Sequence, residues 1–252
     1  MLLVVIRAPA KTHFRNKMLC KIADLTVEIP VTEGLALRLG SYETKENKAP
    51  DIIIREELYT SQEKSGIKDF ETHVYMESGW KFYVGLLKHN GMMLHASAVA
   101  LGGRAYLFSG PSGMGKSTHT RLWEQLFPGA KVFNDDKPAI RCIDGAWYAY
   151  GTPWAGKYGI NINMKTALAG ICFLRRGEAN SIRRLSKFEA ASAVISQTMK
   201  RFMTAAPLDA MLALVNRLVE DIPVFELTAT KDAEAAMLSY QTMCAEVSRN
   251  EN

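Results

Sequence analysis

Long apolar runs, paired cysteines and basic clusters are all absent from this chain of 252 residues. No apolar run approaches the roughly 20 residues that a membrane-spanning helix needs, so no membrane partner is expected. The four cysteines lie far apart without a C-x-x-C pair, which predicts reduced, mostly buried thiols and a cytoplasmic location. No run of Lys and Arg exceeds two residues, and this argues against a nucleic-acid partner.

What the chain does contain is ordinary for a soluble globular protein: 48% hydrophobic and 23% charged residues. Its length allows one domain with an appendage or two small domains. The net charge of +5 fits a phosphate ligand or an acidic partner. The opening six apolar residues have no basic segment before them, so we expect a first strand there and not a signal peptide. A homo-oligomer is compatible with these features.

The first 77 residues are predicted to form a small β-rich region, and residues 78–252 the main domain. Strands are predicted at 23–30, 51–55 and 71–76, separated by polar stretches that carry turn residues. A helical pattern follows over 78–89, and Asn90-Gly91 ends it.

A hairpin precedes the most informative segment of the chain. Residues 94–101 and 104–108 are predicted to pair across a Gly102-Gly103 turn. The strand at 104–109 leads into a glycine loop, and residues 116–127 form an amphipathic helix that Pro128-Gly129 ends. An ordinary βαβ nucleotide fold would place a parallel neighbour, reached through a helix, beside that strand. An antiparallel neighbour in its place is uncommon.

The glycine loop, residues 110–117, reads Gly-Pro-Ser-Gly-Met-Gly-Lys-Ser and matches the phosphate-binding loop pattern. Glycines let the backbone curl so that successive N–H groups face a phosphate, and the following helix adds its positive end. Lys116 is expected to reach the β- and γ-phosphates, and the Ser117 hydroxyl to bind Mg²⁺. Together with these, we expect the nucleotide contacts from Gly110, Ser112, Gly113, Met114, Gly115 and Thr118.

Phosphoryl transfer also needs acidic groups, and Asp135 and Asp136 are the best candidates. They end a predicted strand at 131–136, roughly twenty residues beyond Lys116. Adjacent residues of a strand point to opposite sides, so both could serve only if the chain turns there. Lys137-Pro138 makes such a turn plausible. A solvated Asp-Asp turn is the alternative.

Other candidates have weaker support from the sequence. His95 could project toward the phosphates from the outer hairpin strand, although a lone histidine there is more often structural. His119 is expected to be a surface or packing residue. The glycine-rich segment 151–159 could approach a ligand and bring Lys157 to a phosphate, or be an ordinary connection. A transition-state cation could come from one of four arginines, at positions 175, 176, 183 and 184.

The rest of the chain predicts an alternation of strands and helices. A second hairpin spans 139–143 and 146–150 with an Asp-Gly turn, and a further strand spans 169–174. Ser186-x-x-Glu189 is a capping box that opens a helix to about residue 203. Pro207 fits the first position of the next helix, which runs to about residue 219. A strand at 224–227 and a helix at 231–247 complete the pattern.

Taken together, His95-Ala-Ser-Ala-Val, the two-glycine hairpin, the 110–117 loop and Asn134-Asp135-Asp136 resemble the catalytic half of bacterial HPr serine kinase/phosphorylase. That family shares its fold with the phosphoenolpyruvate carboxykinases. The resemblance covers about residues 90–140. It implies an α/β fold with a mixed β-sheet and a P-loop, and an enzyme that uses ATP and Mg²⁺.

The resemblance also implies roles for single residues. His95 would lie near the transferred phosphate, and one aspartate would bind Mg²⁺ with Ser117 while the other accepts the serine proton. We assign the metal to Asp136 and the base to Asp135, with Lys116 as a further catalytic group. The family's metal-binding Glu has no counterpart, since 151–159 occupies that region. Residues 1–75 do not resemble the family's regulatory domain.

The chain therefore resembles a diverged group of that family, some members of which phosphorylate a serine on a peptide. We expect an ATP-dependent kinase with a protein or peptide acceptor. Two alternatives stay open: a nucleotide-binding module that regulates a partner, and a carboxykinase-like phosphotransferase acting on a small molecule. A GTPase is not expected because no Asn-Lys-x-Asp motif occurs, and an ABC-type ATPase is not expected because no Leu-Ser-Gly-Gly motif occurs.

Overall fold

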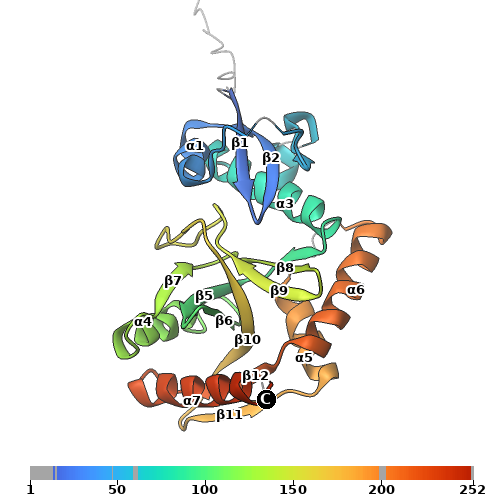
Figure 1. The fold of residues 1–252 in the computed structure, drawn as a ribbon. Coiled ribbons are helices and arrows are strands. Elements are labelled where there is room, and N and C mark those ends of the chain that lie inside the picture. Colours follow the sequence, from blue (N-terminus) through green and yellow to red (C-terminus); the bar gives the residue numbers. More distant parts are fainter. Residues whose placement is uncertain (1–13, 15, 47, 59–61, 199–202, 251–252) are drawn as a thin grey trace, which may run out of the picture.

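A computed structural model describes residues 14, 16–46, 48–58, 62–198 and 203–250 of the chain (Figure 1). The strand predicted for the first six residues lies outside this part. No helix among the described residues has the length and apolar character needed to cross a membrane.

A small sheet with short helices forms the N-terminal unit, at one end of the molecule in Figure 1. The elements are β1 (Asn16–Ile22), β2 (Leu25–Val31), α1 (Glu33–Leu39), the 3₁₀ turns η1 (Gly40–Tyr42) and η2 (Glu56–Leu58), β3 (Ile52–Ile53) and α2 (Gln62–Ser65). β2 pairs antiparallel with β1 and parallel with β3. Ala23 and Asp24 join β1 to β2 at positive φ (52° and 61°), which gives the tight turn. The strands predicted at 23–30 and 51–55 correspond to β2 and β3, but the unit also holds helices that were not predicted, so it is a mixture of strand and helix.

The strand predicted at 71–76 is wrong, because these residues open the helix α3 (Phe70–Leu87). The Asp69 carboxylate caps its first turn by accepting a hydrogen bond from the Thr72 N–H at 2.7 Å. Val74, Ser78, Phe82 and Leu86 recur every fourth residue and are all buried, a helical spacing that overrides the short alternation at its start. The helix runs unbroken across residues 77 and 78, and the boundary between two domains there stays a prediction.

The main sheet is mixed and holds the glycine loop at one of its central strands. Its strands are β4 (Gly91–Met93), β5 (Ala96–Leu101), β6 (Arg104–Ser109), β7 (Lys131–Asn134), β8 (Ala139–Ile143), β9 (Ala146–Tyr150), β10 (Lys165–Arg176), β11 (Ser181–Arg184) and β12 (Val224–Ala229). They run in the order β4-β8-β9-β10-β6-β5-β7, with β12 paired to β10 and β11 paired to β12. Both predicted hairpins, β5–β6 and β8–β9, are confirmed.

Strand β6 has a parallel neighbour after all, on the side away from its hairpin partner. β10 pairs parallel with β6 along its length, whereas β5 pairs antiparallel on the other side. β10 is longer than the predicted strand, and residues 165–167 pair antiparallel with β9 while residues 171–176 pair parallel with β12. The expected mixed sheet is therefore present, and β6 lies at the point where the strand direction changes.

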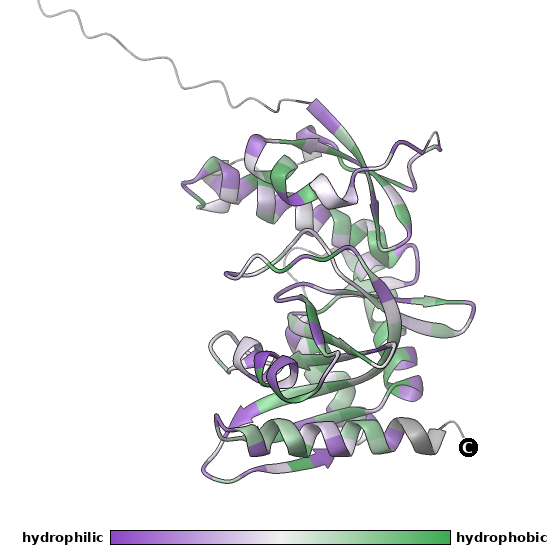
Figure 2. Ribbon diagram, turned by 60° about the vertical axis from the view of Figure 1, so that its left-hand side comes forward, coloured by the Kyte–Doolittle hydropathy of each residue, from purple (hydrophilic) through white to green (hydrophobic). Residues whose placement is uncertain are grey.

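Helices cover both faces of this sheet: α4 (Lys116–Leu126) and α7 (Ala233–Asn250) on one, α5 (Lys187–Gln197) and α6 (Ala205–Asp221) on the other. Alternation along β6 decides the partners, since Tyr106 and Phe108 pack with Trp123 of α4 while Leu107 joins the other core. The central strands are mostly hydrophobic, and the C-terminal helix alternates between hydrophobic and hydrophilic residues (Figure 2).

Two predicted helix boundaries need correction. The capping box is confirmed, because the Ser186 side chain and backbone both bond with Glu189, but α5 ends at Gln197 and not near residue 203. Thr198 is extended and pairs with Leu94, and this contact ends the helix. Pro207 is the third residue of α6 and not its first. It is tolerated there because the first-turn N–H groups have no partner within the helix. All four cysteines are free, and three of them are buried.

Candidate functional site

The glycine loop has three of its glycines in the positive-φ region. Gly110, Gly113 and Gly115 have φ of 140°, 79° and 104°, values that other residues rarely adopt. No side chain caps the first turn of α4, so its N–H groups remain at the loop as donors. The Lys116 ammonium folds over the loop and donates to the carbonyl oxygens of Gly110 (2.8 Å) and Pro111 (3.2 Å).

The two aspartates follow β7 at a turn that the preceding residue creates. The Asn134 carboxamide oxygen accepts hydrogen bonds from the N–H groups of Asp136 (3.1 Å) and Lys137 (2.8 Å). Its amide nitrogen donates to the Thr152 carbonyl at 2.9 Å, which fixes the side chain in a fully buried position. The strand therefore ends at Asn134, and both carboxylates can face the same side.

One cavity of about 480 Å³ collects most of the predicted site residues from segments far apart in the sequence. Its lining includes His95, Lys116, Ser117, Asp135 and Asp136. It also includes Ser112, Gly113, Gly115 and Thr118 of the predicted nucleotide contacts, and Gly156, Lys157 and Tyr158 of the glycine-rich segment. Gly110 and Met114 line a neighbouring pocket and not this cavity.

Asp136 faces the imidazole of His95. The His95 Nε2 lies 3.3 Å from the Asp136 carboxylate, and the Lys137 ammonium lies 3.0 Å from the same oxygen. Burial lowers the pKa of His95 to about 4, helped by the nearby charges of Lys137 and Lys116 and opposed by Asp136. The His95 Nδ1 lies 3.2 Å from the side-chain oxygen of Gln197, so both ring nitrogens face acceptor oxygens and a neutral ring can donate to only one of them.

Asp135 has a different environment from Asp136. It is only 6% exposed, and its two carboxylate oxygens accept hydrogen bonds from the N–H groups of Gly156 (2.7 Å) and Tyr158 (3.0 Å). A Cβ at Gly156 would lie 3.1 Å from the Asp135 Oδ2, so glycine allows this close approach. The carboxylate therefore holds the segment that forms one wall of the cavity.

The lining of the cavity carries two lysines and two aspartates. Lys116 is 7% exposed, and burial lowers the pKa of its ammonium to about 8; Asp136 opposes this shift and Lys137 adds to it. Arg121 of α4 stacks over the ring of Tyr158, with 3.7 Å between the guanidinium carbon and the ring centroid. This contact links residues 156–158, the wall segment of the cavity, to α4.

The remaining sequence candidates have structural partners. His119 is buried, as the packing alternative predicts, and its Nε2 lies 2.9 Å from the Ser239 hydroxyl. Arg176 donates to the Gly113 carbonyl of the loop at 2.5 Å. The other three arginines form ion pairs outside the cavity: Arg175 with Glu226, Arg183 with Glu189 and Glu226, and Arg184 with Glu246.

Sequence reasoning missed Gln197, Lys137 and Arg121. Lys137 adjoins the aspartate pair, so its sequence position could have indicated a role. Gln197 and Arg121 carry no such signal, because only the fold brings Gln197 to His95 across 102 positions. The described residues contain no cluster of three or more His, Cys, Asp or Glu that could hold a metal ion.

No family model and no curated protein sequence matches this chain. One solved structure that it resembles is the Hpr(Ser) kinase/phosphatase from Coxiella burnetii. The match covers 64% of this chain and 93% of that chain at 10% sequence identity, with a TM-score of 0.40.

Proposed function

We propose that this protein is a kinase that transfers the γ-phosphoryl group of ATP to a serine hydroxyl on a protein or peptide, assisted by Mg²⁺. One observation carries the proposal. The lysine and serine of a glycine loop, two carboxylates and an imidazole line one cavity, although they come from three separate segments of the chain. These are the groups that phosphoryl transfer needs for binding phosphate, organising a metal and handling a proton.

The phosphates are proposed to lie against the glycine loop, where free N–H groups and the positive end of α4 favour anions. The Lys116 ammonium would leave its two loop carbonyls for the phosphate oxygens. The nucleoside would then extend past Thr118 into a smaller pocket of about 160 Å³, which Thr118, Leu122 and Thr230 help to line. Arg176, bonded to the Gly113 carbonyl, stiffens the loop between the two pockets.

Mg²⁺ fits the oxygen donors of this cavity. The ion commonly takes one or two protein oxygens and completes its shell with phosphate oxygens and water. The Ser117 hydroxyl and the Asp136 carboxylate both line the cavity and would serve as those ligands, so a larger cluster of acids is not needed. The bound ion would neutralise charge that develops on the transferred group.

Asp136 is also the better candidate for the acceptor proton, which revises the expectation that Asp135 is the base. Both Asp135 oxygens accept a backbone hydrogen bond, whereas the contacts of Asp136 with the ring of His95 and the ammonium of Lys137 both involve its Oδ1. In the proposed step the serine oxygen bonds to the γ-phosphorus and the bond to the β-phosphate oxygen breaks. The hydroxyl proton passes to the Asp136 carboxylate, and ADP leaves.

Calorimetry with ATP and Mg²⁺ tests the nucleotide site. Lys116→Ala should weaken ATP binding roughly tenfold to 100-fold, because it removes charge-assisted hydrogen bonds to phosphate. Lys131→Ala removes an exposed lysine of β7 outside the cavity and should leave the affinity unchanged. Equal affinities in the wild type and in Lys116→Ala would refute the assignment of the loop.

Phosphoryl transfer is tested separately with radiolabelled ATP and serine-containing peptides. Phosphoserine in the product supports the kinase. Tight ATP binding without transfer to any serine peptide or small carboxylate would favour the regulatory module instead. Transfer to a small carboxylate would favour the carboxykinase-like alternative. The cytoplasmic location and a homo-oligomeric state stay predictions.

A further inference from the structure

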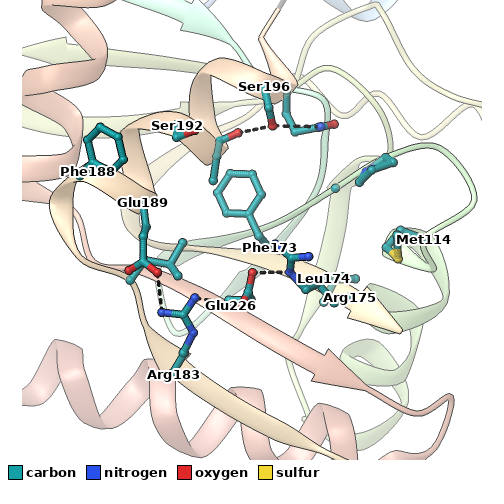
Figure 3. Close-up of a pocket in the computed structure, with 15 residues that line it drawn as sticks. Met114, Phe173, Leu174, Arg175, Arg183, Phe188, Glu189, Ser192, Ser196 and Glu226 are labelled. Atoms are coloured by element: carbon teal, nitrogen blue, oxygen red, sulfur yellow. Dashed lines mark hydrogen bonds and ion pairs between the residues drawn. The ribbon is translucent and has the colours of Figure 1, made fainter. Parts of the chain in front are cut away.

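A groove separate from the cavity runs along one face of α5, and we call it the α5 groove (Figure 3). It encloses about 440 Å³. On the helix side, Phe188, Ser192 and Ser196 recur every fourth residue and therefore lie on one face. Phe173 of β10 and Leu185 contribute apolar surface to the same groove.

Phe188 is unusual among these residues because it is 85% exposed. A phenylalanine side chain gains about 2 kcal/mol or more when it is removed from water, so leaving one in solvent has a cost. It lies in the first turn of α5, which the Ser186–Glu189 capping box holds in place. An exposed aromatic side chain on a fixed helix, at the edge of a groove, is typical of a binding surface.

The charged groups of the groove neutralise one another. Arg175 and Arg183 both pair with Glu226, and Arg183 also pairs with Glu189 at 2.9 Å (Figure 3). Two guanidinium groups and two carboxylates leave no net formal charge on the lining. The groove is therefore complementary to an uncharged, apolar side chain and not to a charged one, which would compete with these pairs.

The groove and the cavity share two boundaries. Gly110 and Pro111 line the groove, and the Lys116 ammonium, which lines the cavity, donates to both of their carbonyls. At the second boundary, Gln197 lines the groove and contacts the His95 ring at 3.2 Å. A ligand in the groove would thus lie beside the imidazole that faces Asp136.

The same contacts argue for the acceptor and against the nucleotide. Ser117 and Thr118, at the helix end where the phosphates are proposed to bind, line the cavity and not the groove, although Gly110 and Met114 of the glycine loop do line the groove. The groove instead lies next to His95, on the side of the proposed proton acceptor. The Gln197 side chain and the His95 ring separate it from Asp136, a span on the order of 10 Å, which an extended peptide covers in about three residues.

We propose that the α5 groove binds the acceptor peptide of the kinase, in an extended form, through a large apolar side chain close to the phosphorylated serine. The inference rests on the proposed function and names the class of its substrate: a peptide segment with Phe, Leu, Ile or Met within about four positions of the serine. Side chains alternate along an extended chain, so the apolar residue enters the groove while the serine faces the cavity.

Selection of peptides on the full-length chain tests the proposal. A displayed library of nonapeptides with a central serine is panned against the protein, and the affinity of each selected peptide is measured by fluorescence polarisation. We expect selected peptides to carry a large apolar residue near the serine. Phe188→Ala should weaken their binding roughly fivefold or more. Leu37→Ala, a matched control on α1 with 81% exposure, should change it less than twofold, within the scatter of surface substitutions.

Several outcomes would overturn the groove without bearing on the kinase. These are peptides selected without an apolar residue, failure to select any peptide, or equal affinities in the wild type and Phe188→Ala. Weaker ATP binding in Phe188→Ala would assign the groove to the nucleoside and would also overturn the proposal. Apolar peptides that depend on Phe188 but are never phosphorylated would support the groove and contradict the proposed kinase.

Discussion

At the scale of single residues, two adjacent aspartates have separate neighbours. The Asn134 side chain turns the chain so that both carboxylates reach one cavity. Asp135 is buried against backbone N–H groups of the wall segment 156–158, whereas Asp136 faces the imidazole and the lysine. Replacing each aspartate by its uncharged amide, asparagine, should therefore change different properties of the protein.

Asp136→Asn should weaken Mg²⁺-dependent ATP binding, because it removes a proposed Mg²⁺ ligand, and should also reduce phosphoryl transfer by roughly 10² to 10⁴, the usual contribution of a general base. Asp135→Asn should have a different effect. An amide cannot accept from both the Gly156 and Tyr158 N–H groups, because one of its termini is itself a donor. The wall segment should loosen, and trypsin should then cleave faster after the exposed Lys157.

Transfer rates and tryptic cleavage, measured on both variants, separate these two roles, and each variant is the control for the other. If Asp135→Asn abolishes transfer while cleavage after Lys157 stays at the wild-type rate, Asp135 is the base. A normal transfer rate in Asp136→Asn would exclude Asp136 from the chemistry.

At the scale of elements, the turn between β1 and β2 links the N-terminal sheet to the main sheet. The Asp24 carboxylate accepts hydrogen bonds from the Tyr150 hydroxyl and the Lys165 ammonium, both at 2.8 Å. Arg141 donates to the carbonyl of the neighbouring Ala23 at 2.6 Å. Burial raises the pKa of Asp24, but the hydrogen bonds from Lys165 and Tyr150 outweigh it and hold the pKa below its usual value.

Asp24→Asn should therefore lower the free energy of unfolding near neutral pH. Asparagine tolerates the positive φ of this position, so the change removes charge without straining the turn. The side chain is 40% exposed, and solvent screening limits the loss to about 1 kcal/mol or less. A lowered pKa in the folded state stabilises above the unfolded value near 3.8, and this stabilisation disappears as the pH falls through the folded value.

Urea unfolding between pH 3 and pH 7 checks this prediction. The difference between the wild type and Asp24→Asn should be constant above about pH 5 and shrink in acid. Lys165→Met and the double variant complete a cycle that isolates the ion pair. If the difference in the free energy of unfolding between the wild type and Asp24→Asn grows as the pH falls, the lowered pKa of Asp24 is contradicted.

The same elements show how far the sequence could predict the fold. Both hairpins, the strand–loop–helix around Gly110 and the capping box of α5 were predictable, because turn and cap residues act locally. The start of α3 was not, since residues 71–76 alternate like a strand and only burial at every fourth position decides for a helix. Positions in the site depend on long-range packing, so Gln197 could not be placed beside His95 from the sequence.

The glycine-rich segment 151–159 gives a related lesson, because its glycines allow the chain to approach itself. A Cβ at Gly151 would lie 1.8 Å from the Ile162 carbonyl oxygen, and one at Gly156 would crowd Asp135. The sequence correctly predicted that this segment approaches other parts of the chain closely. Within the segment, the residues that line the cavity and could contact a ligand are Gly156, Lys157 and Tyr158.

At the scale of the whole molecule, the N-terminal unit and α3 contact the residues on either side of the wall segment 156–158. The Tyr75 hydroxyl donates to the Ala155 carbonyl at 2.7 Å, and the Tyr42 hydroxyl to the Asn161 carbonyl at 3.0 Å. Trp154 stacks on Phe82 with ring centroids 4.8 Å apart. The segment is thus fixed by the N-terminal elements on one side and by Asp135 on the other, so the two ends of the molecule should be coupled through it.

Two glycines of α3 provide a matched test of that coupling. Alanine favours a helix by roughly 1 kcal/mol over glycine at either position, so the two substitutions differ only in what the new Cβ meets. At Gly79 it would lie 2.8 Å from the Trp154 ring, and at Gly85 it would lie 2.9 Å from the Ile52 side chain.

Gly79→Ala should displace the wall segment, speed tryptic cleavage after Lys157 several-fold and slow phosphoryl transfer. Gly85→Ala should shift the thermal unfolding midpoint by a few degrees at most and leave cleavage and transfer unchanged. Similar cleavage rates in the two variants would mean that the cavity wall does not depend on α3.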